Sequence, residues 1–458
     1  MTKNTDIIKK FNKTRHNPKF LCNAPFASMN IQFWETSPCC NNIDLIDDYS
    51  IASISEIWNG ENYRQYRKAI RNGNLPDACS FCKNKLLNGE YESVKIHQYD
   101  TLKVSRIFPN KIRKIEVTLS NICNLECIMC HGVASSSIRK NREKEEPIDF
   151  SYMQKFRTEI KPLLPYMQEI VFLGGEPFLI PLYYDIWEDM ISINPKCKIS
   201  VITNGTIMND NIKSLIERGN FKINLSFDAI TKETYETIRV NAKFEETMAN
   251  MKYFGETLAR QGKRLHIPIC PLRVNRFEIP DLVRFCNDSQ YSINFVDVLW
   301  ATNVAMYSMT SSELKEIKDF YLRQTFIETD TNSQKNITEF KELTQRIDRW
   351  IELAVRRENF KDIFDLKTDM VESLKKQLYE KISETLSRKN IDKDSINEQI
   401  NQFKKTQNQL MSSLPEYYYS NHFFQKLLAV PPEKYISIMQ KASMTYFKDA
   451  YKDLFFYL

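Results

Sequence analysis

Three cysteines stand together in the chain at a spacing that could ligate a metal centre. Cys123, Cys127 and Cys130 form a C-x3-C-x2-C pattern within the stretch SNICNLECIMCHG. Thiolates spaced in this way can wrap one corner of a 4Fe-4S cube and ligate three irons, whereas full ligation takes four thiolates. One iron is then open to another ligand. A zinc site is the alternative, with the adjacent His131 as its fourth ligand.

A second group of cysteines lies near the start of the chain. Cys22, the adjacent Cys39 and Cys40, and the pair Cys79 and Cys82 are separated by stretches rich in Asn, Asp, Ser and Pro. This pattern predicts a small metal-organised module over residues 1–105. The sequence shows no signal peptide, so we expect a cytoplasmic protein whose thiols serve metals rather than disulfides.

The first three cysteines are expected to be positioned by a parallel sheet. Over residues 106–310, short β-branched or aromatic runs alternate with longer helical patterns, as in repeated βα units. Six strands are expected, at residues 114–120, 169–174, 198–203, 222–227, 264–269 and 293–298. Six units are too few to close an eight-stranded barrel, but parallel strands still gather functional loops at their carboxyl ends. The expected fold is α/β, a partial (β/α)6 TIM-like barrel, followed by a helical region of unknown role over residues 311–458.

Polar motifs begin at the ends of these strands. The tetrapeptide GGEP at 174–177 follows the second strand, where glycines let a backbone approach a ligand closely and Glu176 could meet an ammonium group. The third strand ends in the TNG segment at 203–205, and the fourth carries Ser226 and Asp228. These polar groups are placed where a ribose could bind. Taken alone, each motif is also an ordinary turn or helix cap.

The composition excludes several classes of protein. A chain of 458 residues points to two or three domains. Its net charge of +6 comes from 64 basic and 58 acidic residues, an imbalance too small for the basic stripe of a nucleic-acid binder. No segment reaches the roughly 18 uninterrupted apolar residues of a membrane-spanning helix. We therefore expect a globular protein with neither a membrane nor a clear nucleic-acid partner.

The ordered motifs over residues 113 to about 300 resemble the radical S-adenosylmethionine (SAM) superfamily. The cysteine loop corresponds to its cluster motif, which implies a 4Fe-4S cluster whose open iron binds SAM. The resemblance implies that one side chain of the loop lies against the adenine, that GGEP meets the methionine amino group, and that later polar residues hold the ribose. The implied SAM contacts are Met129, Gly174, Gly175, Glu176, Asn204, Ser226, Asp228 and Asn275. The family's glycine-rich adenine segment has no clear counterpart in ICPLRVN, after the fifth strand.

The N-terminal cysteines resemble those of the SPASM and Twitch modules, which carry auxiliary iron-sulfur clusters in radical SAM enzymes. The matching parts are a Cys, a Pro-Cys-Cys, a helical Glu-Ile-Trp segment, and a Leu-Pro followed by C-x-x-C. The resemblance implies a second 4Fe-4S cluster ligated by Cys22, Cys39, Cys79 and Cys82, with Cys40 as the close alternative to Cys39. A full SPASM set has more cysteines and follows the barrel, so a single Twitch-like cluster fits better. A zinc ribbon with the same ligands is the alternative.

The resemblance also implies a reaction. A reduced cluster at the cysteine loop would cleave SAM to methionine and a 5'-deoxyadenosyl radical, which takes hydrogen from a substrate carbon, while the auxiliary cluster accepts an electron or binds substrate. We expect oxidative modification of a peptide or protein side chain, with a reductant such as flavodoxin or ferredoxin. A small-molecule dehydrogenase or epimerase acting on a sugar or aminocyclitol is the alternative. A non-catalytic iron-sulfur or zinc interaction protein is the third hypothesis.

Overall fold

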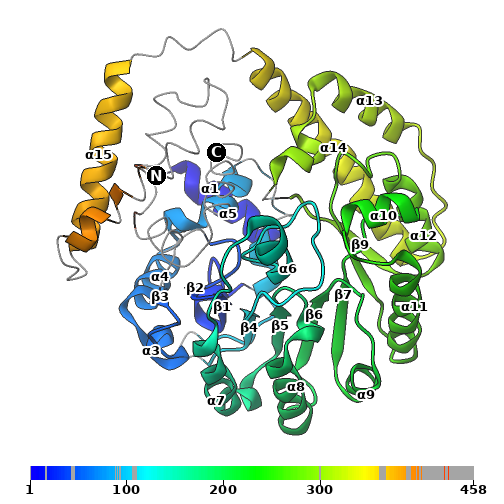
Figure 1. Ribbon diagram of the computed structural model, residues 1–458, viewed down its shortest axis with the longest axis horizontal. Coiled ribbons are helices and arrows are strands. Elements are labelled where there is room, and N and C mark those ends of the chain that lie inside the picture. The colour runs from blue at the N-terminus through cyan, green and yellow to red at the C-terminus, as the bar shows by residue number, and fades with distance from the viewer. Residues whose placement is uncertain are drawn as a thin grey trace. The chain divides into compact units, whose positions relative to one another are not determined.

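The computed structural model of the protein shows two compact units (Figure 1). The residues it describes are 2–15, 18–42, 47–87, 94–105, 111–298, 301–359, 368–387 and 394–398, with positions 89, 91, 400, 401, 404, 428 and 432 described singly. The first unit comprises Met1–Cys123 and Asp149–Asn224, and the second comprises Asn124–Ile148 and Leu225–Leu458. The boundary along the chain therefore falls inside the cysteine loop, directly after Cys123.

The first unit is built on a sheet to which the N-terminal region and the βα region both contribute strands. The strands are β1 (Ser28–Gln32), β2 (Glu35–Ser37), β3 (Asp47–Asp48), β4 (Lys114–Thr118), β5 (Glu169–Leu173), β6 (Lys198–Thr203) and β7 (Phe221–Leu225). Their order is β3-β2-β1-β4-β5-β6-β7. Strands β1, β4, β5 and β6 run parallel, whereas β2 and β3 are antiparallel additions beyond β1. The carboxyl ends of β4, β5 and β6 consequently face one edge of the sheet.

Charged side chains meet at the opposite edge, where these strands begin. Lys114 pairs in register with Glu169, and Glu169 pairs with Lys198. Nζ of Lys114 lies 3.1 Å from a carboxylate oxygen of Glu116 and 3.4 Å from one of Glu169. Opposite charges on facing positions stabilise strand pairing, and the alternation of buried and polar positions disfavours a slip of one residue. This charge network therefore helps to hold β4 in register.

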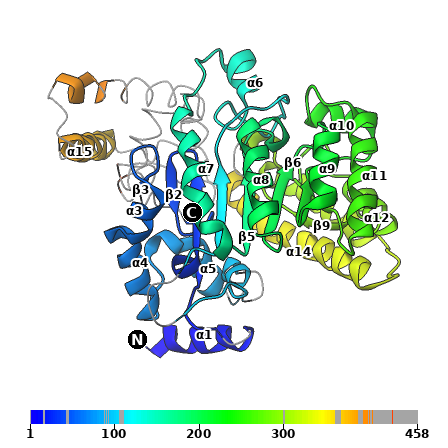
Figure 2. The same ribbon diagram turned by 90° about the horizontal axis from the view of Figure 1, so that it is seen from below.

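Helices follow the parallel strands of the first unit and pack on its sheet. Helices α7 (Lys155–Ile160), α8 (Pro181–Ile193) and α9 (Asp210–Arg218) lie on the same side of the strands (Figures 1 and 2). Trp187 of α8 is fully buried, with its ring centroid 5.6 Å from that of Phe172 in β5 and 5.8 Å from that of Phe221 in β7. Removing a buried aromatic side chain of this size costs about 3–5 kcal/mol. This packing anchors α8 behind the loop that follows β5.

A second hydrophobic core lies in the N-terminal part of the same unit. Its helices are α1 (Thr2–Lys13), α2 (Ala24–Ala27), α3 (Ile54–Asn59), α4 (Glu61–Arg71), α5 (Ser80–Leu87) and the 3-10 helix η3 (Lys95–Tyr99). Phe11, Phe26 and Ile70 are buried there in one cluster that also contains Cys22 and Cys82. Two of the candidate metal ligands are thus shielded from water by aromatic and aliphatic side chains.

The second unit is helix-rich and contains the last two strands. Its elements are α6 (Ser136–Ile138), α10 (Lys232–Ile238), α11 (Phe244–Arg260), β8 (His266–Ile269), α12 (Ile279–Asp288), β9 (Ser292–Phe295), α13 (Ser311–Leu322), α14 (Thr331–Asn359) and α15 (Thr368–Ser387). Strands β8 and β9 pair in parallel. The Asn336 side chain of α14 accepts a hydrogen bond of 3.0 Å from the backbone N–H of Ile293 in β9. Helix α14 thereby covers a strand whose outer backbone groups would otherwise be open to another chain.

The predicted fold class is confirmed, and one feature of the sheet was not expected. All six strands form, as β4 to β9, within three residues of the expected ends, and helices alternate with them. The stretch SMNIQ was not expected to be a strand, yet β1 pairs in parallel with β4 along its whole length. The division into residues 1–105, 106–310 and 311–458 stays a prediction. Three helices lie within residues 311–387, and most of the chain beyond them lies outside the described residues.

Candidate active site and auxiliary metal centre

The GGEP turn packs directly on the start of the cysteine loop in the first unit. A Cβ atom at Gly174 would lie 2.7 Å from the carbonyl oxygen of Ser120, and one at Gly175 would lie 2.2 Å from that of Ile122. The backbone N–H of Glu176 donates to the same Ile122 oxygen at 2.7 Å. Gly174 also has φ +147°, a conformation that L side chains rarely adopt. The two glycines therefore have a role that does not require SAM, because only hydrogen fits between these backbones.

The carboxylate of Glu176 is fully buried and accepts hydrogen bonds from its own chain. Thr203 Oγ1 and the backbone N–H of Asn204 each donate to it at 2.7 Å, and the backbone N–H of Phe178 donates at 3.1 Å. Asn204 Nδ2 in turn lies 4.0 Å from Sγ of Cys123. Glu176 thus holds the turn after β6, which directs an amide N–H toward the first cysteine of the loop. The predicted contacts of Glu176 and Asn204 with SAM stay predictions.

The rest of the loop belongs to the second unit and runs beside the end of α10. The backbone N–H of Glu126 donates to the carbonyl of Val240, and that of Ile128 donates to the carbonyl of Ile238, both at 3.0 Å. Between these two bonds, Arg239 faces Cys127, with Nη1 3.8 Å from Sγ. Burial raises the pKa of the Cys127 thiol, and the Arg239 guanidinium opposes that rise. A cation buried beside the sulfur favours the thiolate form that binds iron.

Asp228 and Asn275 are both fully buried, and their polar atoms bind within the second unit. Asp228 forms an ion pair with Arg239 at 2.6 Å and accepts the backbone N–H of Cys270 at 2.8 Å. The Asn275 side chain donates to the carbonyls of Asp228 and Cys270 and accepts from the backbone N–H of Leu272. The two residues therefore brace the chain around Arg239. Their predicted contact with the ribose stays a prediction.

Four further side chains lie in the predicted site or next to it, and three of them are half-buried. Met129 in the loop and Ser226, directly after β7, are both half-buried, as is Cys130. The backbone N–H of Cys130 donates to the carbonyl of Cys127 at 3.0 Å, which closes a tight turn around the last two cysteines. Next to it, His131 is buried, and this burial lowers the pKa of its ring to about 4. The imidazole is therefore neutral near pH 7.

The N-terminal cysteines are connected by electrostatic interactions between their thiols. The electrostatic neighbours of the Cys22 thiol include Cys79 and Cys82, and those of Cys39 include Cys22, the adjacent Cys40 and Cys79. Burial raises the pKa of the Cys22 and Cys39 thiols above the ordinary range, and the neighbouring thiols raise both further. Cys40 instead shares side-chain hydrogen bonds with Glu116 and Lys95. The arrangement favours the set Cys22, Cys39, Cys79 and Cys82.

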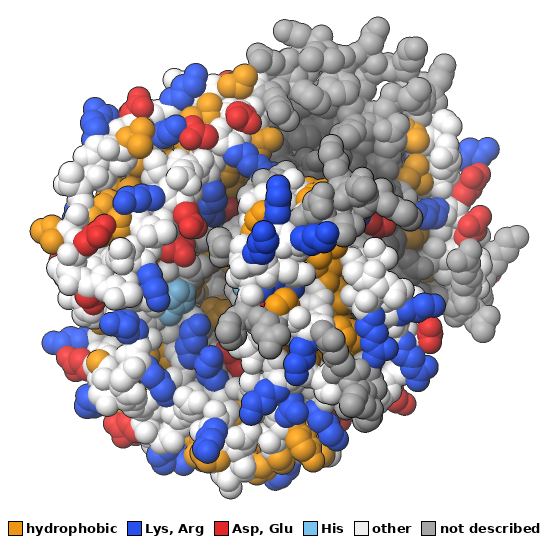
Figure 3. All heavy atoms as spheres, turned by 180° about the vertical axis from the view of Figure 1, so that it is seen from behind, with side chains coloured by type: hydrophobic (Ala, Val, Ile, Leu, Met, Phe, Trp, Pro, Cys, Tyr) orange, Lys and Arg blue, Asp and Glu red, His pale blue; other side chains and the backbone are white. Residues whose placement is uncertain are grey.

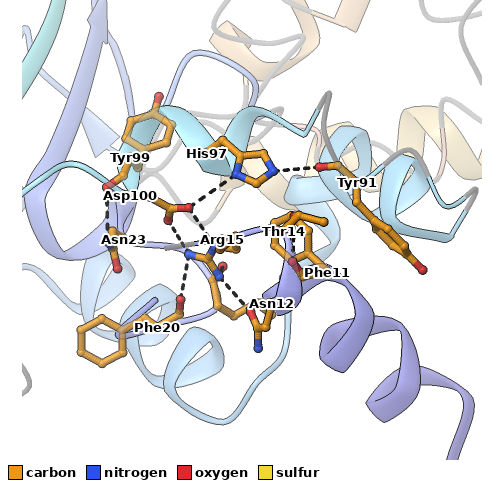
Figure 4. Close-up of polar contacts among 11 residues, drawn as sticks. Phe11, Asn12, Thr14, Arg15, Phe20, Asn23, Tyr91, His97, Tyr99 and Asp100 are labelled. Carbon is orange, nitrogen blue, oxygen red and sulfur yellow. Dashed lines mark hydrogen bonds and ion pairs between the residues drawn. The ribbon is translucent and has the colours of Figure 1, made fainter. Parts of the chain in front are cut away.

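A buried ion pair holds the backbone that leads into Cys22 (Figure 4). The Arg15 side chain is fully buried and makes two contacts with the Asp100 carboxylate, at 2.5 and 2.9 Å. Its other N–H groups donate to the carbonyls of Phe20 and Leu21 at 3.1 and 3.0 Å and to Oδ1 of Asn12 at 3.2 Å. Since Leu21 directly precedes Cys22, this clamp fixes where the first N-terminal ligand emerges. Its guanidinium also lowers the pKa of Cys22, against the larger effect of burial.

Both donor sets consist of cysteine thiols, the ligands that iron-sulfur clusters use. All 11 cysteines lie among the described residues, and the structure contains no disulfide between them. In the described ranges, no group of three or more His, Cys, Asp or Glu side chains is arranged so that it could hold a metal ion. N–H donors approach the sulfurs of Cys123 and Cys127, one in each unit. Hydrogen bonds to ligating sulfurs are a general feature that tunes iron-sulfur clusters.

Arg15, Asp100 and Arg239 were not found by sequence reasoning. Arg15 and Asp100 lie 85 residues apart, and Arg239 lies 112 residues from Cys127. No short motif links either pair, so spacing along the chain gave no signal. Their common property is a charged side chain at a position that the fold buries, which only long-range packing reveals.

The surface offers less specific information. Lys and Arg side chains are interspersed with Asp and Glu over the face drawn in Figure 3, in keeping with the net charge of +6. Among the helices that the structure describes, none is long and apolar enough to cross a membrane.

Comparison with known families matches residues 117–286 to the Radical SAM superfamily. The matched stretch begins inside β4 and ends within α12, so it contains the cysteine loop, the GGEP turn and the buried Asp228–Arg239 pair. These residues form a radical SAM domain. The protein is accordingly an enzyme, and the cofactors of this domain are a 4Fe-4S cluster and SAM.

Part of the chain is similar in sequence or structure to known proteins. It is 25% identical over 248 residues to a probable GTP 3',8-cyclase of Methanocaldococcus jannaschii, which covers 52% of this chain and 76% of that protein. It is 27% identical over 186 residues to a probable GTP 3',8-cyclase of Methanothermobacter marburgensis, or 40% of this chain and 57% of the relative. The crystal structure of Streptococcus suis SuiB bound to precursor peptide SuiA is similar with a TM-score of 0.35 and 16% identity, over 54% of this chain and 58% of SuiB. The chain thus spans less than two thirds of the second relative and of SuiB.

Proposed function

We propose that the protein reductively cleaves SAM and uses the resulting 5'-deoxyadenosyl radical to take hydrogen from a substrate. The observation that carries this proposal is the loop with Cys123, Cys127 and Cys130 at the carboxyl end of β4, within a radical SAM domain. When bound there, a reduced 4Fe-4S cluster with one open iron supplies the electron that breaks a carbon-sulfur bond of SAM. The chain supplies the ligands, the N–H donors around them and a turn that fixes the loop.

Glu176 has a positioning role in this proposal besides its predicted contact with the methionine ammonium group. Its carboxylate fixes the turn that carries Asn204, and its own backbone is bonded to the cysteine loop at Ile122. A change at Glu176 would therefore disturb the loop and the turn after β6 together. The proposed SAM contacts of Met129 and Ser226 are supported by their half-buried positions after β4 and β7.

We further propose that Cys22, Cys39, Cys79 and Cys82 ligate an auxiliary 4Fe-4S cluster. The electrostatic interactions among these thiols and the hydrogen bonds of Cys40 with Glu116 and Lys95 support this set. In a dehydrogenation, the substrate loses one hydrogen atom to the radical and then one proton and one electron. The auxiliary site would accept that electron, and a flavodoxin or ferredoxin would reduce the loop cluster.

The substrate proposed first is a peptide or protein side chain. The support is the likeness of the N-terminal cysteines to SPASM and Twitch modules, which serve enzymes that act on such substrates. A small-molecule substrate is the second candidate, and a specific observation favours it. The two relatives described above are named probable GTP 3',8-cyclases, so a purine nucleotide has to be tested beside peptides.

The test is 5'-deoxyadenosine formation by anaerobically reconstituted, reduced protein. We expect slow formation from SAM alone and faster formation when the substrate is present. Two probes separate the candidates: GTP, and synthetic peptides taken from short reading frames beside the gene. Deuterium transfer from the labelled probe into 5'-deoxyadenosine identifies the substrate class. A reduced protein that binds SAM but makes no 5'-deoxyadenosine would contradict the proposed function.

A further inference from the structure

A buried arginine, Arg239, is held beside the sulfur of Cys127, and cleavage of SAM does not by itself require it. Two backbone hydrogen bonds, at Glu126 and Ile128, clamp the cysteine loop to the segment that carries Arg239. They flank Cys127 on both sides and leave Arg239 opposite it. The guanidinium is nearly fully buried and lies 3.8 Å from Sγ. Backbone hydrogen bonds between the two segments therefore fix the position of the guanidinium relative to the sulfur.

The charge on Arg239 is balanced from the other side. Asp228 accepts from Nε at 2.9 Å and from Nη2 at 2.6 Å, while Nη1 faces the sulfur. The carboxylate of Asp228 is itself held by the backbone N–H of Cys270. Carboxylate, guanidinium and thiol thus form a buried chain in which each group orients the next.

We propose that Arg239 is a positioning residue that sets the reduction potential of the loop cluster through an N–H···S hydrogen bond to Cys127. This inference rests on the proposed function, because it needs a cluster at the loop. Reduction adds one negative charge to a cluster, and a donor and cation at a ligating sulfur stabilise the more negative state. Arg239 therefore makes the cluster easier to reduce. Asp228 moderates this effect, because it withdraws part of the guanidinium charge.

Arg239→Gln and Asp228→Asn should shift the midpoint potential of the loop cluster in opposite directions. Arg239→Gln removes the charge and should shift the midpoint potential of the loop cluster to more negative values. A change of about tenfold in the ratio of reduced to oxidised cluster corresponds to ~59 mV for a one-electron couple. Asp228→Asn leaves the guanidinium uncompensated and should shift the potential to less negative values. A role of Arg239 in folding alone would not produce two shifts of opposite sign.

The experiment is a redox titration of the full chain with both clusters, followed by electron paramagnetic resonance. SAM addition changes the spectrum of the cluster with the open iron, which identifies its signal. The auxiliary cluster is the internal reference and should not shift. Arg142→Gln is the matched control, because the exposed Arg142 donates to the carbonyl of Glu126 in the same loop and not to a sulfur. Its potential should equal that of the wild type.

A second measurement uses the wild-type protein, with Arg239→Lys as its control. In wild-type protein grown with 15N-arginine, pulsed electron paramagnetic resonance of the reduced loop cluster should show a 15N coupling, and Arg239→Lys should lose it. An unchanged potential in Arg239→Gln that holds its full iron content overturns the inference. If that variant does not hold its cluster, absence of the 15N coupling in the wild type overturns it. A wild type that lacks the loop cluster or makes no 5'-deoxyadenosine instead contradicts the proposed function.

Discussion

The two cysteine sets are built in different ways. The loop set lies within eight positions along the chain, from Cys123 to Cys130, and its spacing is readable from the sequence. The N-terminal set stretches from Cys22 to Cys82, and its members are brought together by a hydrophobic core that includes Phe11 and other buried side chains. A short loop needs only its own turns to present thiolates. The dispersed set depends on folding of the surrounding unit.

Their electrostatic surroundings differ as well. The Cys127 sulfur faces the guanidinium of Arg239, whereas Cys39 is surrounded chiefly by other thiols and by apolar side chains. A buried cation beside a ligating sulfur favours added negative charge, and a desolvated thiol cluster disfavours it. The loop cluster should therefore gain more from its surroundings on reduction than the auxiliary cluster does. Strand β4 links the two regions, because it pairs with β1 and leads into the loop.

The largest expected effects are the loss of iron and of SAM cleavage, and they should differ between the two cysteine sets. Replacing Cys123, Cys127 and Cys130 together with Ala should abolish 5'-deoxyadenosine formation and reduce the iron content from about eight to about four atoms per chain. Cys22→Ala should also lose about four irons but continue to cleave SAM, while product formation stops. Iron analysis and chromatography of the nucleoside products measure both. Zinc in the N-terminal set, or only about four irons in the wild type, would break the comparison.

The next prediction sharpens the choice between two adjacent residues. Cys39→Ser should lose most of the auxiliary cluster, because Cys39 lies among the other thiols. Cys40→Ser is the matched control and should keep its iron, because Cys40 faces Glu116 and Lys95. Iron content and visible absorption after reconstitution report the difference. Equal losses in both variants, or a loss in Cys40→Ser alone, would contradict the proposed ligand set.

The clamp before Cys22 should matter for stability. Arg15→Met leaves the largely buried Asp100 carboxylate without its arginine, with His97 Nδ1 still 3.6 Å away, and removal of one member of a buried ion pair costs about 3–5 kcal/mol. Arg64→Met is the control, since the Arg64–Glu61 pair is exposed and surface pairs contribute about 0–1 kcal/mol. Urea unfolding of the two variants, followed by circular dichroism, measures the difference. Similar midpoints for both would show that the clamp does not stabilise this region.

A smaller effect is expected at the turn beside the loop. Glu176→Gln replaces one acceptor oxygen with an N–H group that faces the donors Thr203 and Asn204. We expect iron to be retained and SAM affinity to fall roughly tenfold to a hundredfold, the range for hydrogen bonds to a charged group. Equilibrium binding under anaerobic conditions measures it. If Glu176 acts through the turn, Asn204→Ala should weaken binding too, and the double variant should lose less than the sum. Additive losses would point to independent contacts.

The smallest effect concerns pH and the strand that links the two regions. Burial alone would raise the pKa of Glu169, but the Lys114 ammonium lowers it below its ordinary value of 4.5. A lowered folded-state pKa means that stability is present above pH ~4.5 and is lost as the pH falls through the lowered pKa. Urea midpoints should therefore decrease below about pH 4.5, and Lys114→Met should show a weaker decrease. An identical pH dependence in both proteins would exclude this pair as its source.

The strands β4 to β9 and the cysteine loop could be predicted from short stretches of sequence. Alternation of apolar residues has a range of only a few positions, so the strands β4 to β9 could be found one at a time. The spacing of Cys123, Cys127 and Cys130 is equally local, and it predicts a cluster with one open iron without reference to the fold. The matched domain over residues 117–286 agrees with that interpretation. What a few neighbouring residues encode can be read from them directly.

The partners of these residues come from long-range packing. The contact of Arg239 with Cys127 spans 112 positions and that of Arg15 with Asp100 spans 85. The pairing of β1 with β4 depends on packing in the same way, as do the different neighbours of Cys39 and Cys40. Spacing along the chain does not reveal the partner of a buried charge, nor which of two adjacent cysteines binds a metal. The interaction energies of these groups come from neighbours that the folded chain supplies. Their roles therefore emerge only when distant segments pack together.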